Sequence, residues 1–348
     1  METDKTLTAD KLIEVLTQLG DQLRKPDDEL NQLASLIQAK NAWFIPQNVC
    51  RAVFSIGEML NRQDLTHWFS LQKQQKPTIH SMKKVGLILA GNIPAVGFHD
   101  ILCVLVAGHQ ALIKLSSQDQ LLIPYLLKKL IDITPAITEQ IQYIDRLQGF
   151  DAVIATGSTN TSRYFDYYFR NVPHIIRKNR NSLAVLRGDE TQADLKQLGH
   201  DIFDYFGLGC RNVSKLYVPT DYDFRLFFEA IEPFQWVSNH SKYTNNYDYH
   251  KSILLVNRET HLDNGFLLLK PAESLWSPLA VLNYETYEDL ASLGGKIKLL
   301  DEQIQCVVSA SIPELAIDQV RFGHSQRPKL WDYADRANTM DFLFKQAL

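Results

Sequence analysis

The order of apolar segments between residues 83 and 219 constrains the fold of this chain more than any other feature. Short apolar runs alternate there with longer stretches whose apolar residues recur every three or four positions, as on one face of a helix. "KKVGLILAGNIP" (Lys83–Pro94) predicts a strand followed by a turn, and "ALIKLS" predicts a strand after the next helix. Strands that alternate with helices form parallel sheets with right-handed crossovers. We therefore predict an α/β fold with parallel sheets.

The same alternation predicts two α/β units with a helical layer before them. "AVIATG" (Ala152–Gly157) predicts a strand of the first unit, and "STNTSRYFDYYFRNV" predicts the helix after it. Residues 121–141 predict one helix and a second helix after Pro135. The second unit begins with the strand "SLAVLRG", the helix "TQADLKQLGHDIFDYF" and the strand "KLYVP". Residues 7–71 predict several amphipathic helices that prolines interrupt.

The composition is that of a globular protein without a basic excess. Of the 348 residues, 45% are hydrophobic and 22% are charged, and the formal net charge is -4. Proteins that bind nucleic acid tend to be basic, so nucleic acid is not expected as a partner. The N-terminal residues lack the apolar core of a signal peptide. The longest apolar stretch contains His99, Asp100, His109 and Gln110, so no membrane span is predicted.

The four cysteines predict neither a disulfide framework nor a metal site. Cys50, Cys103, Cys210 and Cys306 lie far apart in the sequence and form no C-x-x-C pair. Unpaired cysteines are typical of a reducing compartment, so we expect a cytoplasmic protein.

The neighbours of Cys210 distinguish it from the other cysteines. Gly207 and Gly209 precede it, and "SKLYVP" (Ser214–Pro219) predicts a strand just after it. Glycines allow a sharp turn and a close approach to a ligand, which a packed core position does not need. A thiol on a loop before a strand is rigidly held and still accessible, which suits a nucleophile. The alternative is a buried thiol that acts as a small hydrophobe.

Two segments are candidates for binding a nucleotide. "ATGSTNTSRYF" places Gly157 and Ser158 between an apolar strand and a helix, where backbone N–H groups and the helix dipole attract phosphate. The alternative is that Ser158 or Thr159 only caps the helix. Lys114 ends a strand, the place where open parallel sheets bind ligands, and it either contacts a nucleotide or stays solvated. The segments contain no G-x-G-x-x-G fingerprint, so a conventional Rossmann mode is not indicated.

Six motifs, taken in order, resemble those of the aldehyde dehydrogenase superfamily, and within it the LuxC-like acyl-CoA reductases of the bioluminescence fatty acid reductase type. "LAGNIPAV" resembles the Asn-x-Pro turn, "VAGHQALIKLSSQ" the lysine-containing cofactor segment, and "IATGSTNTSR" the Thr-Gly-Ser turn of that superfamily. "FGLGCRNVSKLYVP" resembles its cysteine loop, "ESLWSPLAVLNYET" its Glu-x-Phe-Gly-Pro-Val segment, and "VRFGHSQ" its C-terminal Pro-Phe-Gly-Gly. The resemblance extends from about residue 85 to the C-terminus.

The resemblance implies an aldehyde dehydrogenase-like fold with two α/β domains, a Rossmann-like cofactor domain and a catalytic domain. We expect the N-terminal helices and the nucleotide-binding domain at 1–183, and the catalytic domain with the cysteine loop at 184–316. A C-terminal segment, 317–348, is expected to return to the cofactor domain. Because the family usually forms dimers or tetramers, a homo-oligomer is also expected.

The resemblance also implies roles for individual residues. Cys210 matches the nucleophile, and Asn92 matches the side chain that donates a hydrogen bond to the oxyanion. Lys114 matches the lysine that holds the adenosine ribose, and Ser158, after Gly157, matches the pyrophosphate contact.

Three further positions concern the cofactor. The glutamate that binds the cofactor ribose aligns with Ser274, and Glu273 lies one place earlier, so either residue can hold the ribose. NAD-preferring members carry a glutamate three places after the lysine, where this chain has Ser117. A neutral serine does not repel the 2′-phosphate of NADP, so NADPH is the expected cofactor.

The resemblance implies reduction of an acyl-CoA, in particular a fatty acyl-CoA, to an aldehyde with NADPH through an acyl-cysteine. The family's glutamate that activates water is missing, because the matching segment is "IIRKNRNSLAVL", and its absence favours reduction over hydrolysis. One alternative is an oxidising NAD(P)-dependent aldehyde dehydrogenase in which another carboxylate, such as Glu273, activates water. The other is a non-catalytic subunit that holds an acylated partner. The expected partners are an acyl donor and an acyl-activating protein.

Two remaining features are interpreted as structural. The basic segment "RKNRN" (Arg177–Asn181) predicts a solvated connection, with contact to CoA or a cofactor phosphate as the alternative. His99 and His109 lie on or beside a predicted buried helix and are expected to be hydrogen-bonded structural histidines rather than catalytic ones.

Overall fold

The computed structural model of the chain describes residues 7–25, 27–73, 82–157 and 159–345. Contacts within the chain define two compact units, which we call unit 1 (residues 1–179 and 328–348) and unit 2 (residues 180–327). These divisions differ from the expected ones after residues 183 and 316. The strand that begins unit 2 starts at Asn181, and the Gln319 side chain bonds to Ser309 and Ile312 of unit 2.

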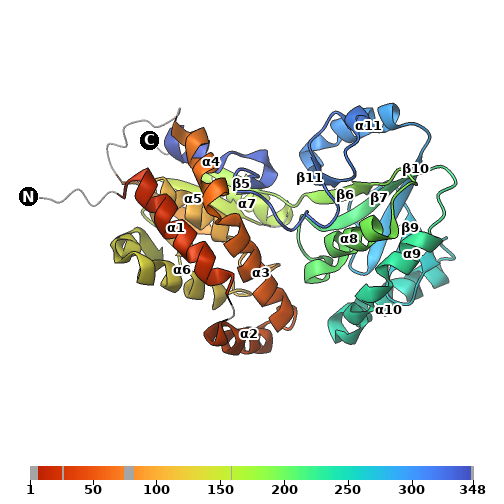
Figure 1. The fold of residues 1–348 in the computed structure, drawn as a ribbon, viewed down its shortest axis with the longest axis horizontal. Coiled ribbons are helices and arrows are strands. Elements are labelled where there is room, and N and C mark those ends of the chain that lie inside the picture. Colours follow the sequence, from red (N-terminus) through yellow and green to blue (C-terminus); the bar gives the residue numbers. More distant parts are fainter. Residues whose placement is uncertain (1–6, 26, 74–81, 158, 346–348) are drawn as a thin grey trace, which may run out of the picture. The chain divides into compact units, whose positions relative to one another are not determined.

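The first helices of unit 1 form the predicted helical layer. They are α1 (Ala9–Leu23), α2 (Asp28–Lys40), α3 (Pro46–Met59) and α4 (Arg62–Lys73). Thr8 caps α1 by accepting from the Lys11 N–H, and a proline occupies the first turn of α3, where its missing N–H costs no helical hydrogen bond. Figure 1 shows α1, α3 and α4 side by side, and their apolar faces join one continuous core.

The sheet of unit 1 is parallel throughout, as predicted. Its strand order is β3 (Ile141–Tyr143), β2 (Gln110–Lys114), β1 (Lys84–Ile88), β4 (Ala152–Thr156) and β5 (His174–Arg177). The connecting helices are α5 (Phe98–Val106), α6 (Leu122–Ile133) and α7 (Thr159–Phe169). The order reverses between β1 and β4, which makes this the point where such a sheet binds a ligand beyond the carboxyl ends of its strands.

Two of these strands and one short helix differ from the sequence expectations. The helix predicted after Pro135 is a single 3-10 segment, Pro135–Gln140, because the next residues, Ile141–Tyr143, pair with the sheet as the edge strand β3. The strand β5 was not predicted, and it includes the start of the supposed solvated connection. The prediction for Arg177 was wrong, since its side chain is only 4% exposed.

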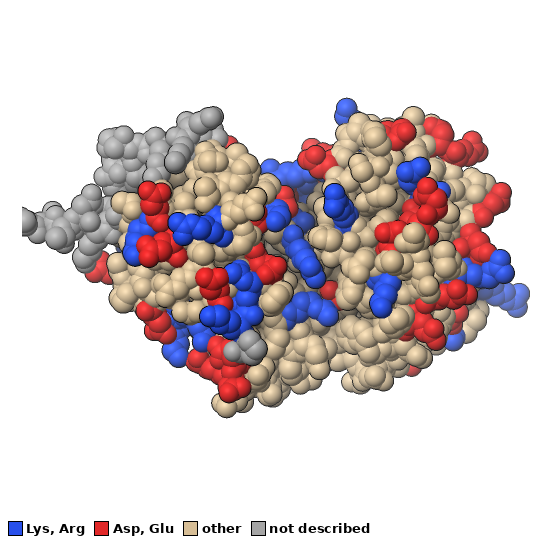
Figure 2. Space-filling model, in the orientation of Figure 1, with Lys and Arg blue, Asp and Glu red and all other residues tan. Residues whose placement is uncertain are grey.

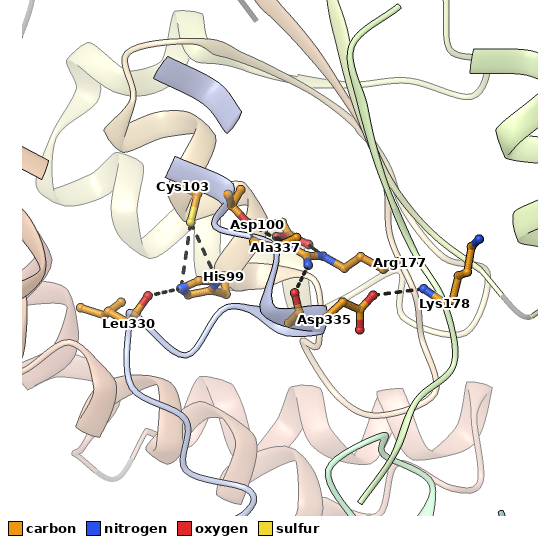
Figure 3. A network of polar contacts seen from close by, with 10 residues as sticks. His99, Asp100, Cys103, Arg177, Lys178, Leu330, Asp335 and Ala337 are labelled. Atoms are coloured by element: carbon orange, nitrogen blue, oxygen red, sulfur yellow. Dashed lines mark hydrogen bonds and ion pairs between the residues drawn. The ribbon is translucent and has the colours of Figure 1, made fainter. Parts of the chain in front are cut away.

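Arg177 joins the C-terminal segment to the sheet of unit 1. Its guanidinium forms a buried ion pair with Asp100 on α5 (2.6 Å) and donates to Thr339 and to the Ala334 carbonyl, both in the C-terminal segment. Burial alone would raise the pKa of Asp100, but the charge of Arg177 outweighs it and holds this pKa below its ordinary value. Figure 3 shows the network, in which the backbone N–H of Lys178 also donates to the Asp335 carboxylate. The segment ends in α12 (Thr339–Lys345), which packs on α5.

The two histidines of this region are structural, as expected. The His99 ring bonds to the Leu330 carbonyl at 2.9 Å, which Figure 3 also shows, and the His109 ring bonds to the Leu343 carbonyl at 3.3 Å. Burial lowers the pKa of His109, so this ring is neutral at physiological pH. Both rings therefore contribute to docking of the C-terminal segment.

Unit 2 is built on a seven-stranded sheet that is parallel except at one edge. Its order is β12 (Gln319–Val320), β11 (Ile304–Val308), β6 (Asn181–Val185), β7 (Val213–Pro219), β10 (Val281–Tyr287), β9 (Leu268–Pro271) and the antiparallel β8 (Leu262–Asp263). Its helices are α8 (Gln192–Phe203), α9 (Arg225–Ile231), α10 (Ser241–Val256) and α11 (Leu290–Leu299). Figure 1 shows α11 on one face of this sheet and α8, α9 and α10 on the other.

The surface of each unit carries charges of both signs. Figure 2 shows acidic and basic side chains on the visible face of both units, in keeping with the small net charge of -4. Within the described residues, no helix combines the length and the apolar character that crossing a membrane requires.

Candidate active site

The turn after β1 carries Asn92 at the carboxyl edge of the unit 1 sheet. The Asn92 side chain is exposed, and the turn is held by the buried carboxylate of Asp119, which accepts from the Ala95 N–H at 2.8 Å. A side chain at Gly91 would collide with Ser116, so this glycine lets the turn after β1 approach the segment after β2. Burial raises the pKa of Asp119. Sequence reasoning did not identify Asp119 as a residue that holds this turn.

Lys114 and Ser117 lie at the same edge of the sheet. Lys114 is the last residue of β2, and Ser117 follows it in the segment that packs against the β1 turn. Both side chains are exposed. A cation and a hydroxyl are thus presented next to the turn that carries Asn92, at the edge where a nucleotide is expected.

Gly157 connects β4 to α7 at the switch point of the sheet. A Cβ atom at Gly157 would come within 3.1 Å of Thr161 and 3.0 Å of Phe165, so the glycine allows the first turn of α7 to pack closely on the end of β4. This arrangement directs the N-terminus of α7 to the carboxyl edge, where a helix N-terminus binds phosphate. Ser158, predicted to contact the pyrophosphate, lies outside the described residues.

These observations fit a dinucleotide on unit 1. Three segments that carry predicted cofactor or oxyanion residues follow β1, β2 and β4, and parallel strands end at one edge. Thr161 and Phe165 fill the space beside Gly157, and the N-terminus of α7, two residues later, is the group that attracts phosphate. The predicted residues Asn92, Lys114, Ser117 and Gly157 are therefore brought together in unit 1.

The loop of Cys210 lies in unit 2 between α8 and β7, as predicted. The chain leaves α8 through three residues with positive φ, Tyr205 (55°), Phe206 (59°) and Gly207 (77°). A non-glycine residue in this region costs free energy and is enriched at functional sites. The Cys210 side chain is partly exposed, as the nucleophile hypothesis requires.

Asn212 stabilises the Cys210 loop through hydrogen bonds of its side chain. Its side-chain N–H groups donate to the carbonyls of Asp201 (3.1 Å) and Asp204 (2.9 Å), which caps the C-terminal end of α8. Its side-chain oxygen accepts from the Gly209 N–H at 2.8 Å, and its own N–H donates to the Gly209 carbonyl at 3.0 Å. Asn212 is buried, so these bonds stabilise one loop conformation on either side of Cys210.

A second thiol, that of Cys306, is connected to the backbone of this loop through Ser182. The Ser182 hydroxyl donates to the Cys210 carbonyl at 2.9 Å and lies 3.0 Å from the sulfur of Cys306. Burial raises the pKa of Cys306 to about 11, so this sulfur is protonated and donates to Ser182. Cys306 thereby supports the backbone of the cysteine loop.

Glu273 and Ser274 occupy the connection between β9 and β10 in unit 2. Both side chains are exposed, as is the indole of Trp276 (63%). The backbone of this connection is bonded to β7 and β10 through the side chains of Lys215 and Asn283. Sequence reasoning did not identify these two residues, although a lysine inside the mostly apolar strand "VSKLYVP" is a signal that could have found Lys215.

Solved structures with the same fold include aldehyde dehydrogenases. Aldehyde dehydrogenase 21 from Physcomitrella patens, in complex with succinate, matches with a TM-score of 0.67 and 12% identity, over 97% of this chain and 85% of that chain. An aldehyde dehydrogenase from Burkholderia cenocepacia matches with a TM-score of 0.65 and 14% identity, over 91% of this chain and 79% of that chain. The NADP-dependent glyceraldehyde-3-phosphate dehydrogenase from Bacillus halodurans, in complex with NADP, matches with a TM-score of 0.61 and 15% identity, over 91% of this chain and 79% of that chain. The predicted aldehyde dehydrogenase-like fold is confirmed.

The sequence itself matches one family. No curated protein matches the chain at a significant level. A family model described as acyl-CoA reductase (LuxC) matches residues 20–226, which is more than half of the 348 residues and includes both Asn92 and Cys210. The match begins well before residue 85, so the family pattern extends into the N-terminal helices that the motifs had not covered. The chain belongs to the LuxC acyl-CoA reductase family.

Proposed function

We propose that this protein reduces an acyl-CoA thioester, with a fatty acyl group, to an aldehyde with NADPH through an acyl group carried by Cys210. The observation that supports the proposal most is the construction of the cysteine loop. Asn212 and Ser182 hold the backbone around a partly exposed thiol, whereas the buried Cys103 and Cys306 have pKa values raised by burial. The membership of the chain in a family of acyl-CoA reductases agrees with this chemistry.

The first step is acyl transfer to Cys210. The thiolate attacks the thioester carbon, the new C–S bond forms, and the bond to the CoA sulfur breaks. The proton lost by the Cys210 thiol ends on the CoA thiol. Because one thioester replaces another, the step is nearly isoergic, and its rate depends on donors to the tetrahedral oxyanion. We assign that role to the Asn92 amide and the Cys210 backbone N–H, and loss of one such donor typically costs about 10²–10³ in rate.

The second step is reduction of the acyl-Cys210 thioester. When bound, NADPH supplies a hydride to the thioester carbon. The same two donors stabilise the oxygen that becomes negative, and collapse of the tetrahedral adduct breaks the C–S bond and releases the aldehyde. The Cys210 thiolate is regenerated and takes up a proton. The sum is acyl-CoA, NADPH and a proton giving aldehyde, CoA and NADP⁺.

The proposal also assigns the cofactor contacts. Lys114 and the N-terminus of α7 bind the adenosine ribose and the pyrophosphate, and Ser117 leaves space for a 2′-phosphate without repelling it. Glu273 or Ser274 binds the other ribose. The proposal also includes an acyl-activating partner protein, a homo-oligomer and a cytoplasmic location.

Incubation with a panel of acyl-CoAs and NADPH, with the aldehyde quantified, tests the proposal. Aldehyde formation that requires both substrates and Cys210 supports it. Production of acid from aldehyde without CoA would identify an oxidising dehydrogenase instead. A Cys210 thiol that no acyl donor modifies would identify a non-catalytic subunit.

A further inference from the structure

The connection between β9 and β10 is unusual because it joins two neighbouring parallel strands without a helix. Residues 272–280 run from the end of β9 to the start of β10, which is shorter than the dozen or more residues that such a crossover commonly takes. Without a helix, most carbonyl groups of this connection need partners from elsewhere in the protein, although the Ser274 hydroxyl donates to the Trp276 carbonyl within it (2.8 Å).

Three side chains of the sheet satisfy five consecutive carbonyls of this connection. The Lys215 ammonium donates to the carbonyls of Ala272 (2.8 Å) and Glu273 (2.7 Å). The Asn283 amide donates to those of Ser274 (3.0 Å) and Trp276 (2.9 Å). The Ser214 hydroxyl donates to that of Leu275 (2.7 Å). We call residues 272–276 the anchored loop.

The register of the sheet explains how the three donors reach one loop. Lys215 on β7 is the direct partner of Asn283 on β10, so their side chains leave the sheet on the same face. Ser214 would point to the other face in a regular strand. The register between β6 and β7 shifts at this residue, and such a bulge re-aims a side chain.

The Lys215 ammonium forms three hydrogen bonds in this arrangement. It is fully buried, and its third N–H group donates to Glu285 (2.6 Å), which also pairs with Lys296. An ammonium group has three donors, and here all three have partners. Burial lowers the pKa of Lys215 against the opposing effect of Glu285. Such a charge is retained only where its partners compensate for its removal from water.

The consequence is a loop whose carbonyls bond to the sheet while most of its side chains are exposed. Glu273, Ser274 and Trp276 are exposed, while Leu275 is buried. The strand that provides two of the donors also begins three residues after Cys210. We propose that Lys215, Ser214 and Asn283 are positioning residues: they set the affinity for the nicotinamide dinucleotide by holding the anchored loop, and they do not contact the cofactor themselves. This inference rests on the proposed function.

The test compares cofactor binding with acylation in the full chain. Asn283→Ala removes two of the five hydrogen bonds, and Ser214→Ala removes one. We expect Asn283→Ala to raise the dissociation constant for NADPH, titrated without acyl donor, about tenfold, and Ser214→Ala to raise it about threefold. Acylation of Cys210 by acyl-CoA in the absence of cofactor should stay within about twofold of the wild type in both variants. Lys215→Met should weaken NADPH binding further.

A matched control is Asn264→Ala, which removes an amide that holds another turn of unit 2, at Phe266 and Leu267. It should leave NADPH binding unchanged. The inference is overturned if folded Asn283→Ala and Ser214→Ala proteins bind NADPH as the wild type does, or if Asn264→Ala weakens binding equally. Failure of the wild type to form aldehyde while it binds NADPH overturns the proposed function alone, and a wild type that binds no nicotinamide dinucleotide overturns both.

Discussion

At the scale of single residues, the surroundings of each cysteine decide which one can act as a nucleophile. Burial raises the pKa values of Cys50, Cys103 and Cys306, which disfavours the thiolate that reacts. Cys210 lies on a loop whose backbone is fixed by Asn212 and Ser182. The flanking glycines predicted this difference, whereas the support from Ser182 and Cys306 depends on sheet contacts between distant parts of the chain, which the sequence does not show.

Substitution of the cysteines tests this assignment. Cys210→Ala should abolish acylation of the protein by acyl-CoA, while Cys50→Ala, Cys103→Ala and Cys306→Ala should retain it. Intact-protein mass spectrometry after incubation without cofactor measures the acyl adduct. If the Cys210→Ala protein carried as much acyl adduct as the wild type, the proposed mechanism would be wrong.

Ser117 is expected to determine the choice between the two nicotinamide cofactors. Its exposed side chain is neutral, and a carboxylate in its place would repel the 2′-phosphate of NADPH. The wild type should bind NADPH more tightly than NADH, and Ser117→Glu should reverse this order by weakening NADPH binding about tenfold or more. Ser116→Ala serves as the control, since it adds no charge. Tighter binding of NADH by the wild type in titration would contradict this view of the cofactor site.

At the scale of elements, polar side chains at the ends of helices and strands hold the site-bearing segments. Asp119 fixes the turn after β1, Asn212 caps α8, and Arg177 joins β5 to the C-terminal segment. The strongly periodic helices and apolar central strands were predicted from the sequence. The short edge strands β3 and β5 were not, because only one of their residues is fully buried and their pairing comes from neighbours in space.

The contact between α2 and α6 predicts a dependence of stability on pH. Asp27 caps α2 and accepts from Tyr125 (2.7 Å) and Lys129 (2.5 Å) on α6. Partial burial alone would raise its pKa, but these hydrogen bonds lower the pKa of Asp27 from its ordinary value of 3.8 to about 2. A lowered carboxyl pKa contributes stability that is complete above the unfolded-state pKa and is lost as the pH falls through the folded-state value. The window is therefore about pH 4 to about pH 2.

Asp27→Asn isolates this effect, because asparagine caps a helix as well as aspartate but carries no charge. The difference in free energy of unfolding between the wild type and Asp27→Asn should shrink as the pH falls from about 4 to about 2, measured by urea unfolding at each pH. A constant difference for Asp27→Asn across this window would contradict the ion-pair explanation.

At the scale of the whole molecule, the chain combines two units, each built on a largely parallel sheet. The order of six motifs predicted an aldehyde dehydrogenase-like fold and the LuxC family, and the fold and family comparisons confirm both. The residues that hold the motifs in place, such as Asp119, Asn212 and Lys215, are spread along the chain and acquire their roles only through tertiary contacts. For this reason the candidate reacting groups could be predicted from the sequence and their supports could not.

The fate of the acyl group on Cys210 tests the central claim most directly. The segment that aligns with the family's water-activating glutamate is "IIRKNRNSLAVL", and it offers no carboxylate to activate water. The acyl-enzyme formed from acyl-CoA without NADPH should therefore persist for much longer than one turnover, and addition of NADPH should discharge it as aldehyde. The measurement is a quenched time course that quantifies acid and aldehyde from the wild-type acyl-enzyme. Aldehyde released on NADPH addition, with little acid before it, is the predicted result, whereas acid that accumulates at a rate comparable with reduction would contradict the reductase assignment.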